Sequence, residues 1–413
     1  MSAIAPRREA ASRPKRTMWI WLALGILALI MRVTLVPTSD PDTGSFHWCV
    51  LCGSLGLSDF IANVILFIPA AVALRFSGLT PWRIVGGLFA LSVAIEVAQL
   101  WIPGRESALS DVLSNTLGAA VGVGLAAWWR SRRRSLIGVG ASVGAALTVI
   151  AAGGLALRPH FPPTRYFGQW TAQLGQFDTY RGRVLSASIG ATALPSWELP
   201  DSRTARAQLD RSDSLVVRAV AGPRPLHLAP LFSIADDRER EILLLGVDGA
   251  DLVFMVSTRA ADLRLRQPML RWPRALAAVS AGDTLSLAAW RTSTGWCLRL
   301  NQLARCGMAY RADRLWSLVG PLPGRLLGVE PVIGCLFMAL LAFPVGLLAP
   351  RRASGWLAIA AMLCGAALLP QLVGLAPLTY LDAAALLASV GAGMIASLPP
   401  PVSIAGSGDT LPV

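Results

Sequence analysis

The sequence predicts an α-helical integral membrane protein of about eight spans with one inserted all-β sandwich, and two observations lead to this fold class. Of the 413 residues, 54% are hydrophobic and only 15% are charged, whereas a soluble globular chain carries about a quarter charged residues. The mean hydropathy is accordingly positive, at +0.55. The apolar stretches are interrupted once, by a long polar stretch at residues 158–325.

The expected spans are stretches of roughly 20 mostly apolar residues, the length that crosses a bilayer as a helix. The first stretch follows Arg13, Lys15 and Arg16 and lacks a small-residue cleavage site in good context, so we expect an uncleaved anchor. The spans are Met18–Val36, Phe60–Phe76, Ile84–Ile102, Val112–Trp129, Leu136–Leu157, Val332–Leu348, Trp356–Gly374 and Tyr380–Leu398.

The basic residues set the expected orientation. The formal net charge is +13, and arginines gather in the N-terminal tail and in alternate short loops, as the positive-inside rule predicts for cytoplasmic segments. We therefore expect both termini to be cytoplasmic, with residues 1–17 forming a basic tail and residues 158–325 lying outside. The charge is thus divided among loops and domains, which argues against nucleic acid as a partner. The loop residues are Arg75, Arg83, Arg130, Arg132, Arg133, Arg134, Arg351 and Arg352.

Polar residues occur where the second, third and fourth spans should meet the outer leaflet. Charged groups inside a bilayer are costly, at roughly 2.5–3.5 kcal/mol near its centre on insertion scales, and they usually face a bundle interior and pair. Arg105 and Arg32 are the available cations, so we expect an ion-pair network. The candidate site residues are Asp59 and Asn63, Glu96 and Gln99, Arg105, and Asp111 and Asn115.

Two other interpretations remain open for parts of this cluster. Ser58 and Ser110 have the character of helix caps, which would explain Asp59 and Asp111 as acids in a first helical turn. The amides could simply join helices through hydrogen bonds. Neither interpretation explains Glu96, because a negative charge at a helix C-terminus opposes the helix dipole.

A heptamer recurs: Leu57–Ser58–Asp59–x–x–x–Asn63 is repeated as Leu109–Ser110–Asp111–x–x–x–Asn115. Together with Phe67–Ile68–Pro69, Glu96, Gln99, Pro103–Gly104–Arg105 and Gly118, these residues make the stretch from about residue 18 to 130 resemble the VanZ-like family of membrane proteins. The resemblance implies a four-helix membrane domain at residues 18–135 in a bacterial inner (plasma) membrane. It also implies a role in the cell envelope, linked to glycopeptide (teicoplanin) resistance, and supplies no reaction.

The sequence of residues 158–325 predicts an antiparallel β-sandwich of short strands. The predicted strands are Ser214–Val220, Leu228–Ile234, Glu241–Val247, Leu252–Thr258, Thr284–Trp290 and Trp296–Leu300. Their pattern resembles concanavalin A-like lectin and laminin-G jelly rolls, which often bind glycans and sometimes calcium. Asp236, Asp237, Asp248 and Asp251 could ligate calcium, although a solvated turn explains them better. We predict no metal and no cofactor.

The cysteines suggest two local pairs. Folding the chain about Asn301–Gln302 places Cys297 opposite Cys306, so we expect a cross-strand disulfide outside the cytoplasm. Cys49 and Cys52 have the spacing of a redox pair or half of a metal site, and a local disulfide or two free thiols is preferred over zinc.

The remaining segments complete the expected organisation. Residues 136–157 form a fifth membrane helix, residues 326–398 form three C-terminal helices, and residues 399–413 form a disordered tail. The leading functional hypothesis is binding or modification of a lipid-linked cell-wall precursor or polymeric glycan at the outer leaflet. The alternative is a structural or interaction protein whose outer domain binds glycan or protein. Whether the chain is an enzyme, and its oligomeric state, stay open.

Overall fold

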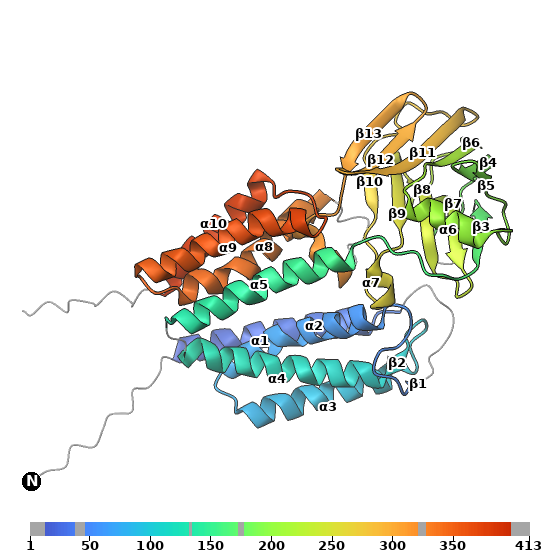
Figure 1. Cartoon of the computed structure of the whole chain (residues 1–413). Helices are drawn as coiled ribbons and strands as arrows, with labels where there is room; N and C mark the ends of the chain where they lie inside the picture. The colour runs from blue at the N-terminus through green and yellow to red at the C-terminus, as the bar shows by residue number, and fades with distance from the viewer. Residues whose placement is uncertain (1–12, 38–45, 132–133, 172–176, 321–327, 398–413) are drawn as a thin grey trace, which may run out of the picture.

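The computed structural model describes residues 13–37, 46–131, 134–171, 177–320 and 328–397. It consists of long helices and a separate region of β-sheets inserted between the fifth and sixth of the long helices (Figure 1). The long helices are α1 (Arg13–Thr34), α2 (Gly56–Phe76), α3 (Pro81–Gln99), α4 (Leu109–Ser131), α5 (Leu136–Ala156), α8 (Glu330–Leu348), α9 (Ala353–Leu372) and α10 (Tyr380–Ala396). The expected tail at residues 399–413 lies outside the described residues.

Within the described part of the chain, seven helices are long and apolar enough to cross a membrane. They are α1–α5, α8 and α9, and each coincides with a predicted span. The eighth predicted span is α10, a 17-residue apolar helix, which stands at the lower length limit for crossing. Large apolar side chains such as Leu340, Leu357 and Leu372 are more than two-thirds exposed, as expected for side chains that face lipid.

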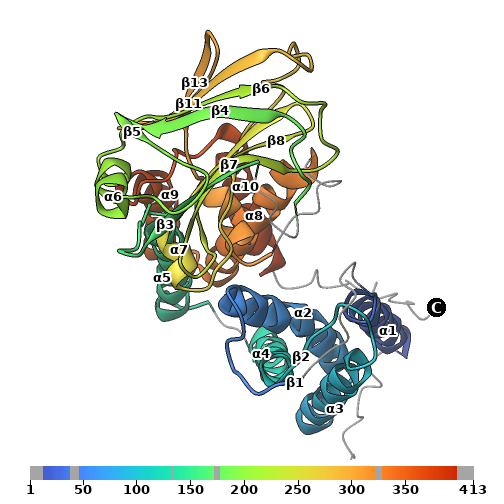
Figure 2. The ribbon, with the colours of Figure 1, turned by 90° about the vertical axis from the view of Figure 1, so that its right-hand side faces the viewer.

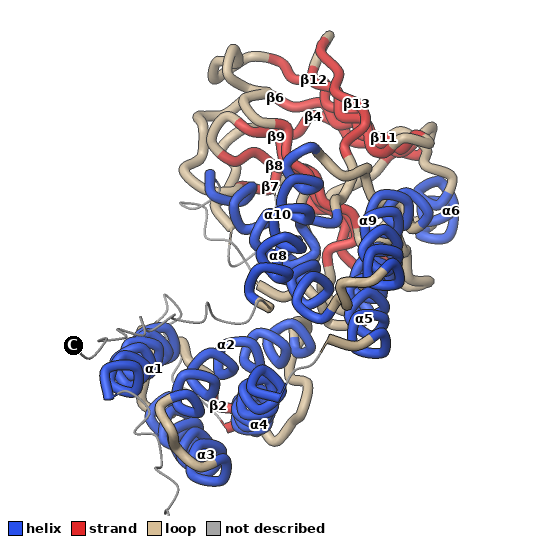
Figure 3. Tube along the Cα trace, turned by 90° about the vertical axis from the view of Figure 1, so that its left-hand side faces the viewer, coloured by secondary structure: helices blue, strands red, loops and turns tan. Residues whose placement is uncertain are grey.

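The helices form two groups. Helices α1–α4 share one buried apolar cluster, and α5, α8, α9 and α10 line another; Figure 3 shows the two groups side by side. Small residues allow close approach within each group. A Cβ atom added at Gly118 of α4 would lie 2.3 Å from the carbonyl oxygen of Val64 in α2, and one added at Gly346 of α8 would lie 2.0 Å from that of Val390 in α10. Backbones this close are typical of helix pairs inside membranes.

The ends of the helices differ in charge. Arg130 donates a hydrogen bond to the carbonyl oxygen of Arg75, and Arg134 donates to Ser397, so the short basic loops and the end of α10 gather at one end. The sheets lie at the other end of the helices (Figure 1). In the end-on view of Figure 2 the sheets overlie α5, α8, α9 and α10, whereas α1–α4 lie to the side.

The region between α5 and α8 contains two antiparallel sheets. The five-stranded sheet has the order β10–β9–β8–β7–β3 and the six-stranded sheet the order β13–β12–β11–β6–β4–β5. Their strands are β3 (Tyr166–Trp170), β4 (Arg183–Ile189), β5 (Thr192–Ala193), β6 (Leu215–Val220), β7 (Ala229–Asp236), β8 (Glu241–Asp248), β9 (Asp251–Val256), β10 (Leu270–Trp272), β11 (Thr284–Thr292), β12 (Gly295–Leu300) and β13 (Leu303–Met308). Helix α6 (Ser202–Asp210), the short helix α7 (Arg259–Asp262) and the 3-10 helix η1 (Ala312–Leu318) accompany them.

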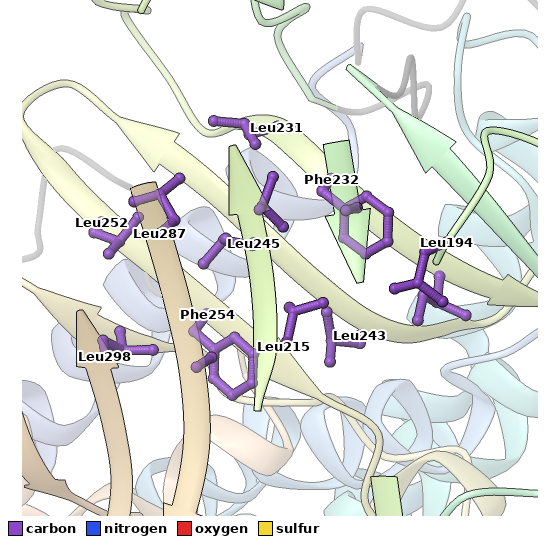
Figure 4. Packing of buried hydrophobic residues seen from close by; sticks show 14 of the residues in the cluster. Leu194, Leu215, Leu231, Phe232, Leu243, Leu245, Leu252, Phe254, Leu287 and Leu298 are labelled. Carbon is purple, nitrogen blue, oxygen red and sulfur yellow. The ribbon is translucent and has the colours of Figure 1, made fainter. Parts of the chain in front are cut away.

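The two sheets share one apolar core. Phe232 and Phe254 from the five-stranded sheet and Leu287 and Leu298 from the six-stranded sheet are fully buried in the same cluster, as Figure 4 shows. All six predicted strands are present. They could be predicted because alternating or β-rich apolar runs indicate strands locally. Strands β3, β4, β5 and β10 and helix α6 were not predicted, since they are short or mix polar and apolar residues without a clear period.

Both candidate cysteine pairs are bonded: the expected hairpin disulfide forms, and so does one between Cys49 and Cys52, for which the sequence left two free thiols as an alternative. Cys297 bonds to Cys306 across the β12–β13 hairpin, whose strands end at the pair Leu300 and Leu303, so the predicted turn at Asn301–Gln302 is confirmed. Cys49 bonds to Cys52. Cys335 and Cys364 are free.

Removing the hairpin disulfide should destabilise the sheet edge. Strand β13 is exposed over most of its length, and the bond closes a separation of nine residues. The double variant Cys297→Ser/Cys306→Ser is therefore expected to lose about 2–3 kcal/mol of unfolding free energy, measured by denaturant unfolding of the purified protein. Cys364→Ser, which removes an exposed free thiol, is the control, and an equal effect of both variants would contradict the expectation.

Candidate functional site

The structure brings the predicted site residues to the ends of α2, α3 and α4 that lie nearest the sheets. Helices α2 and α4 begin there and α3 ends there. A short parallel pairing of β1 (Phe46–His47) with β2 (Ser107–Ala108) ties the loop before α2 to the turn between α3 and α4. The two copies of the repeated heptamer accordingly occupy the same end of two helices that run in the same direction.

Glu96 holds the turn between α3 and α4 in place. Its side chain is buried, with the residue 4% exposed, and its Oε2 atom accepts a hydrogen bond of 2.9 Å from the backbone N–H of Ala108. Its backbone carbonyl accepts a 2.6 Å hydrogen bond from the hydroxyl of Ser107. The carboxylate also lies close enough to that of Asp111 for the two to repel.

Two buried amides each leave an oxygen without a partner. Asn115 donates a 2.9 Å hydrogen bond to the hydroxyl of Ser92, and Gln99 donates a 3.0 Å hydrogen bond to the carbonyl oxygen of Thr34. Among the residues that the structure describes, the side-chain oxygens of Asn115 and Gln99 have no hydrogen-bond partner. Buried polar groups normally have one, so each of these two oxygens can still accept a hydrogen bond.

Asp111 is half-buried in the first turn of α4. Its Oδ1 atom accepts a 3.1 Å hydrogen bond from the hydroxyl of Ser110, and the amide of Asn63 lies beside the same carboxylate and interacts with it. The site therefore joins acids and amides from α2, α3 and α4.

Asp59 has a different role from the one expected. It is exposed and forms a 3.0 Å ion pair with Arg266 from the sheet region. The neighbouring Ser58 does not cap its helix: its hydroxyl donates to the carbonyl oxygen of Leu318 at 2.7 Å and accepts from the N–H of Arg266 at 2.8 Å. Asp59 and Ser58 thus fasten the inserted sheets to α2.

The expected ion-pair network with Arg105 and Arg32 is wrong. Arg105 donates to the carbonyl oxygens of Val36 at 2.9 Å and Val33 at 2.7 Å, where it satisfies the end of α1, and within the described ranges neither arginine pairs with a carboxylate. The cation that does pair, Arg266, lies 207 residues beyond Asp59 in the chain, and no local sequence signal could have linked them.

The site is rich in hydrogen-bond acceptors. The carboxylates of Glu96 and Asp111 and the free amide oxygens of Asn115 and Gln99 all accept hydrogen bonds when the acids are ionised. Such a set suits a ligand that presents hydroxyl or ammonium groups. No group of three His, Cys, Asp or Glu residues suited to a metal occurs in the described part of the chain.

The fold and this cluster define a multi-pass membrane protein with a polar, acceptor-rich site at one end of a four-helix unit. Residues 15–130 match the VanZ/LLP1 family model, which covers α1–α4 and all seven predicted site residues. The resemblance expected from about residue 18 to 130 is confirmed over this range. No curated protein and no solved structure matches the chain.

Proposed function

We propose that the α1–α4 unit binds the polar headgroup of an envelope lipid, with sugar hydroxyls or amino groups of the headgroup donating to Asp111, Asn115 and Glu96. The observation that carries this proposal is the buried, unpartnered side-chain oxygen of Asn115, which lies one helical turn after Asp111 on α4. An unsatisfied buried acceptor costs roughly 1–3 kcal/mol, and a bound donor would offset that cost.

The orientation of the chain supports an outer-leaflet site. In the proposed topology the basic end of the helices faces the cytoplasm with both termini, and the sheets are extracytoplasmic, because arginine-rich short loops stay inside. The site then lies at the outer headgroup level of a bacterial plasma membrane. A lipid-linked cell-wall precursor carries both a sugar and a lipid anchor, and its sequestration would connect the site to glycopeptide resistance.

The sheet region would hold a glycan polymer. Its six-stranded sheet presents an outward face on which Arg218 and Arg299 are exposed, with the Arg299 guanidinium 6.0 Å from the ring centre of Trp290. Arginine and aromatic side chains together suit an anionic polysaccharide. A jelly-roll, concanavalin A-like topology for these strands belongs to the same proposal.

The conservative substitution Glu96→Gln tests the headgroup proposal. A glutamine oxygen still accepts from the N–H of Ala108, so the fold should persist while the negative charge is lost. We expect Glu96→Gln and Asp111→Asn to reduce lipid-linked precursor retained by the purified protein about tenfold, the equivalent of one lost charged hydrogen bond of about 1.4 kcal/mol. Teicoplanin susceptibility of cells that express the variants should rise in parallel.

The matched control is Asp59→Asn, at the corresponding position of the repeated heptamer. Its carboxylate pairs with Arg266, so this variant should weaken the attachment of the sheets and leave precursor retention intact. Retention and susceptibility that stay at the wild-type level in Glu96→Gln and Asp111→Asn, with normal thermal stability, would reject the proposal.

A structural role is the second candidate, and the hydrogen bond from Ala108 to Glu96 favours it. If Glu96 only joins α3 to the start of α4, Glu96→Gln should lower the midpoint temperature of unfolding without a separate loss of precursor retention. Thermal unfolding and lipid retention measured on the same preparation separate the two candidates.

A further inference from the structure

A basic pocket of about 540 Å³ opens between the inserted region and the loop before α2. Three segments that are far apart in the sequence form it: the loop after the Cys49–Cys52 disulfide, the turn between β7 and β8, and helix α7. Its lining residues are Gly53, Ser54, Arg238, Arg240, Ala261, Asp262 and Arg264. Three arginines and one acid therefore line the pocket.

The arginines of the pocket are held in different ways. Arg240 is fixed by Asp236, to which its Nε and a terminal nitrogen lie at 2.8 and 2.7 Å, and Asp236 is buried behind it. Arg264 donates one hydrogen bond to the carbonyl oxygen of Leu51, which leaves its other N–H groups unused by that contact. Arg238 is exposed and has no acidic partner among the described residues.

The one carboxylate that lines the pocket already has ion-pair partners within the chain. Asp262 lies 3.4 Å from Nε2 of His160 and 3.7 Å from Arg240. Counting Asp262 and the buried Asp236 against the three arginines leaves one net positive charge. Both acids pair with Arg240, so neither Arg238 nor Arg264 has an acidic partner among the described residues. The other acids of the same turn, Asp237 and Glu239, do not line the pocket.

We propose that this pocket binds the phosphate group of an anionic lipid headgroup. Guanidinium groups match phosphate oxygens through paired, charge-assisted hydrogen bonds. Ser54 precedes the first residue of the membrane-spanning helix α2 by only two positions, so the pocket lies at the level of the headgroups. It uses none of the side chains assigned to the Glu96 cluster, and the inference does not rest on the proposed function.

The test compares lipid retention by the full chain. The protein is purified gently, mixed with equal amounts of phosphatidylglycerol and phosphatidylcholine in detergent, and examined by native mass spectrometry. The wild type should retain phosphatidylglycerol in preference to phosphatidylcholine. Arg238→Gln/Arg264→Gln should lose about tenfold in that preference, since one charge-assisted hydrogen bond corresponds to about that factor.

Two further variants keep the test decisive. Arg238→Glu changes one exposed side chain without touching the contact of Arg264 with Leu51, so it should fold normally and reverse the preference even if the double variant does not fold. Arg291→Glu, at an exposed position on β11, makes the same charge change far from the pocket in sequence and should behave as the wild type. An unchanged preference in Arg238→Glu would overturn the proposal.

A competition arm identifies the source of the phosphate. Inorganic phosphate and pyrophosphate are added without lipid and then in excess over lipid. Weak binding of either anion alone, with lipid retained at millimolar anion, supports a headgroup ligand. Tight binding of the free anion with displacement of the lipid would overturn the lipid assignment. Glu96→Gln should keep the phosphatidylglycerol preference, so a failure here is distinguishable from a failure of the Glu96 site.

Discussion

Replacing Arg311 by Met is expected to lower the free energy of unfolding by about 3–5 kcal/mol, the usual effect of breaking a buried ion pair. Arg311 precedes η1 and donates to Asp313 Oδ1 at 2.8 Å and to Asp382 Oδ2 at 2.9 Å. The side chains of Asp313 and Asp382 are only 5% and 3% exposed. Without the guanidinium group, the buried carboxylates of Asp313 and Asp382 would lose their shared cation. Arg314 would remain, at 3.5 Å from Asp313.

This network joins the end of the sheet region to the C-terminal helices. Asp382 also caps α10 by accepting hydrogen bonds from the backbone N–H and hydroxyl of Thr379. Loss of Arg311 should therefore loosen the start of α10 as well as η1. Thermal unfolding in detergent measures the overall loss, and hydrogen exchange at residues 312–318 and 380–385 locates it.

Two comparisons make the Arg311 prediction specific. Arg291→Met removes an exposed arginine from β11 and should change stability by less than about 0.5 kcal/mol. Adding Asp382→Asn to Arg311→Met should restore part of the loss, because the asparagine oxygen can still cap α10 and carries no charge. Equal midpoint temperatures for Arg311→Met and Arg291→Met would show that the network contributes nothing to stability.

The sequence predicts the elements well and the contacts between them poorly, for a physical reason. The length and apolarity of a span are local properties, as is the alternation within β11 and β12. The Cys297–Cys306 bond could also be predicted, since both cysteines lie in one hairpin. By contrast, the contact of Ser58 with Leu318 joins residues 260 positions apart, and no local period encodes it.

The candidate site shows the same division. The heptamer spacing correctly places Asp111 and Asn115 on consecutive turns of one helix. The turn that follows α3 then brings this helix back alongside α3, which carries Glu96. The partner of Arg105 was predicted incorrectly because charge counting considers only carboxylates. Its actual partners are carbonyl oxygens at the end of α1, where unpaired backbone acceptors always occur.

The two proposed sites have opposite chemistry at the same end of the helices. The cluster of Glu96, Asp111 and Asn115 accepts hydrogen bonds, whereas the pocket of Arg238 and Arg264 donates them. A headgroup that joins a phosphate to a sugar presents both kinds of group. The separate variants described above therefore ask whether one lipid spans both sites or whether each holds its own ligand.

Packing of α4 against α2 sets the position of Asn115, and Gly118→Val should disrupt it. An added Cβ atom at Gly118 would lie 2.3 Å from the carbonyl oxygen of Val64 and 3.1 Å from Cβ of Phe67, so the helices must separate. Inserting atoms into a packed interior costs about 1–3 kcal/mol, and contact with backbone places this variant at the upper end. Because Asn115 lies one turn earlier on α4, its hydrogen bond to Ser92 should be strained as well.

Gly124→Val supplies the matched control on the same helix, because a Cβ atom there meets nothing within 4 Å. It should leave the midpoint temperature of unfolding and the lipid-linked precursor retention near wild type, whereas Gly118→Val should lower both. Similar midpoint temperatures for the two valine variants would mean that α2 and α4 are not held together by this close approach. Lowered stability with full retention in Gly118→Val would show instead that Asn115 need not be held against Ser92 for the site to bind its ligand.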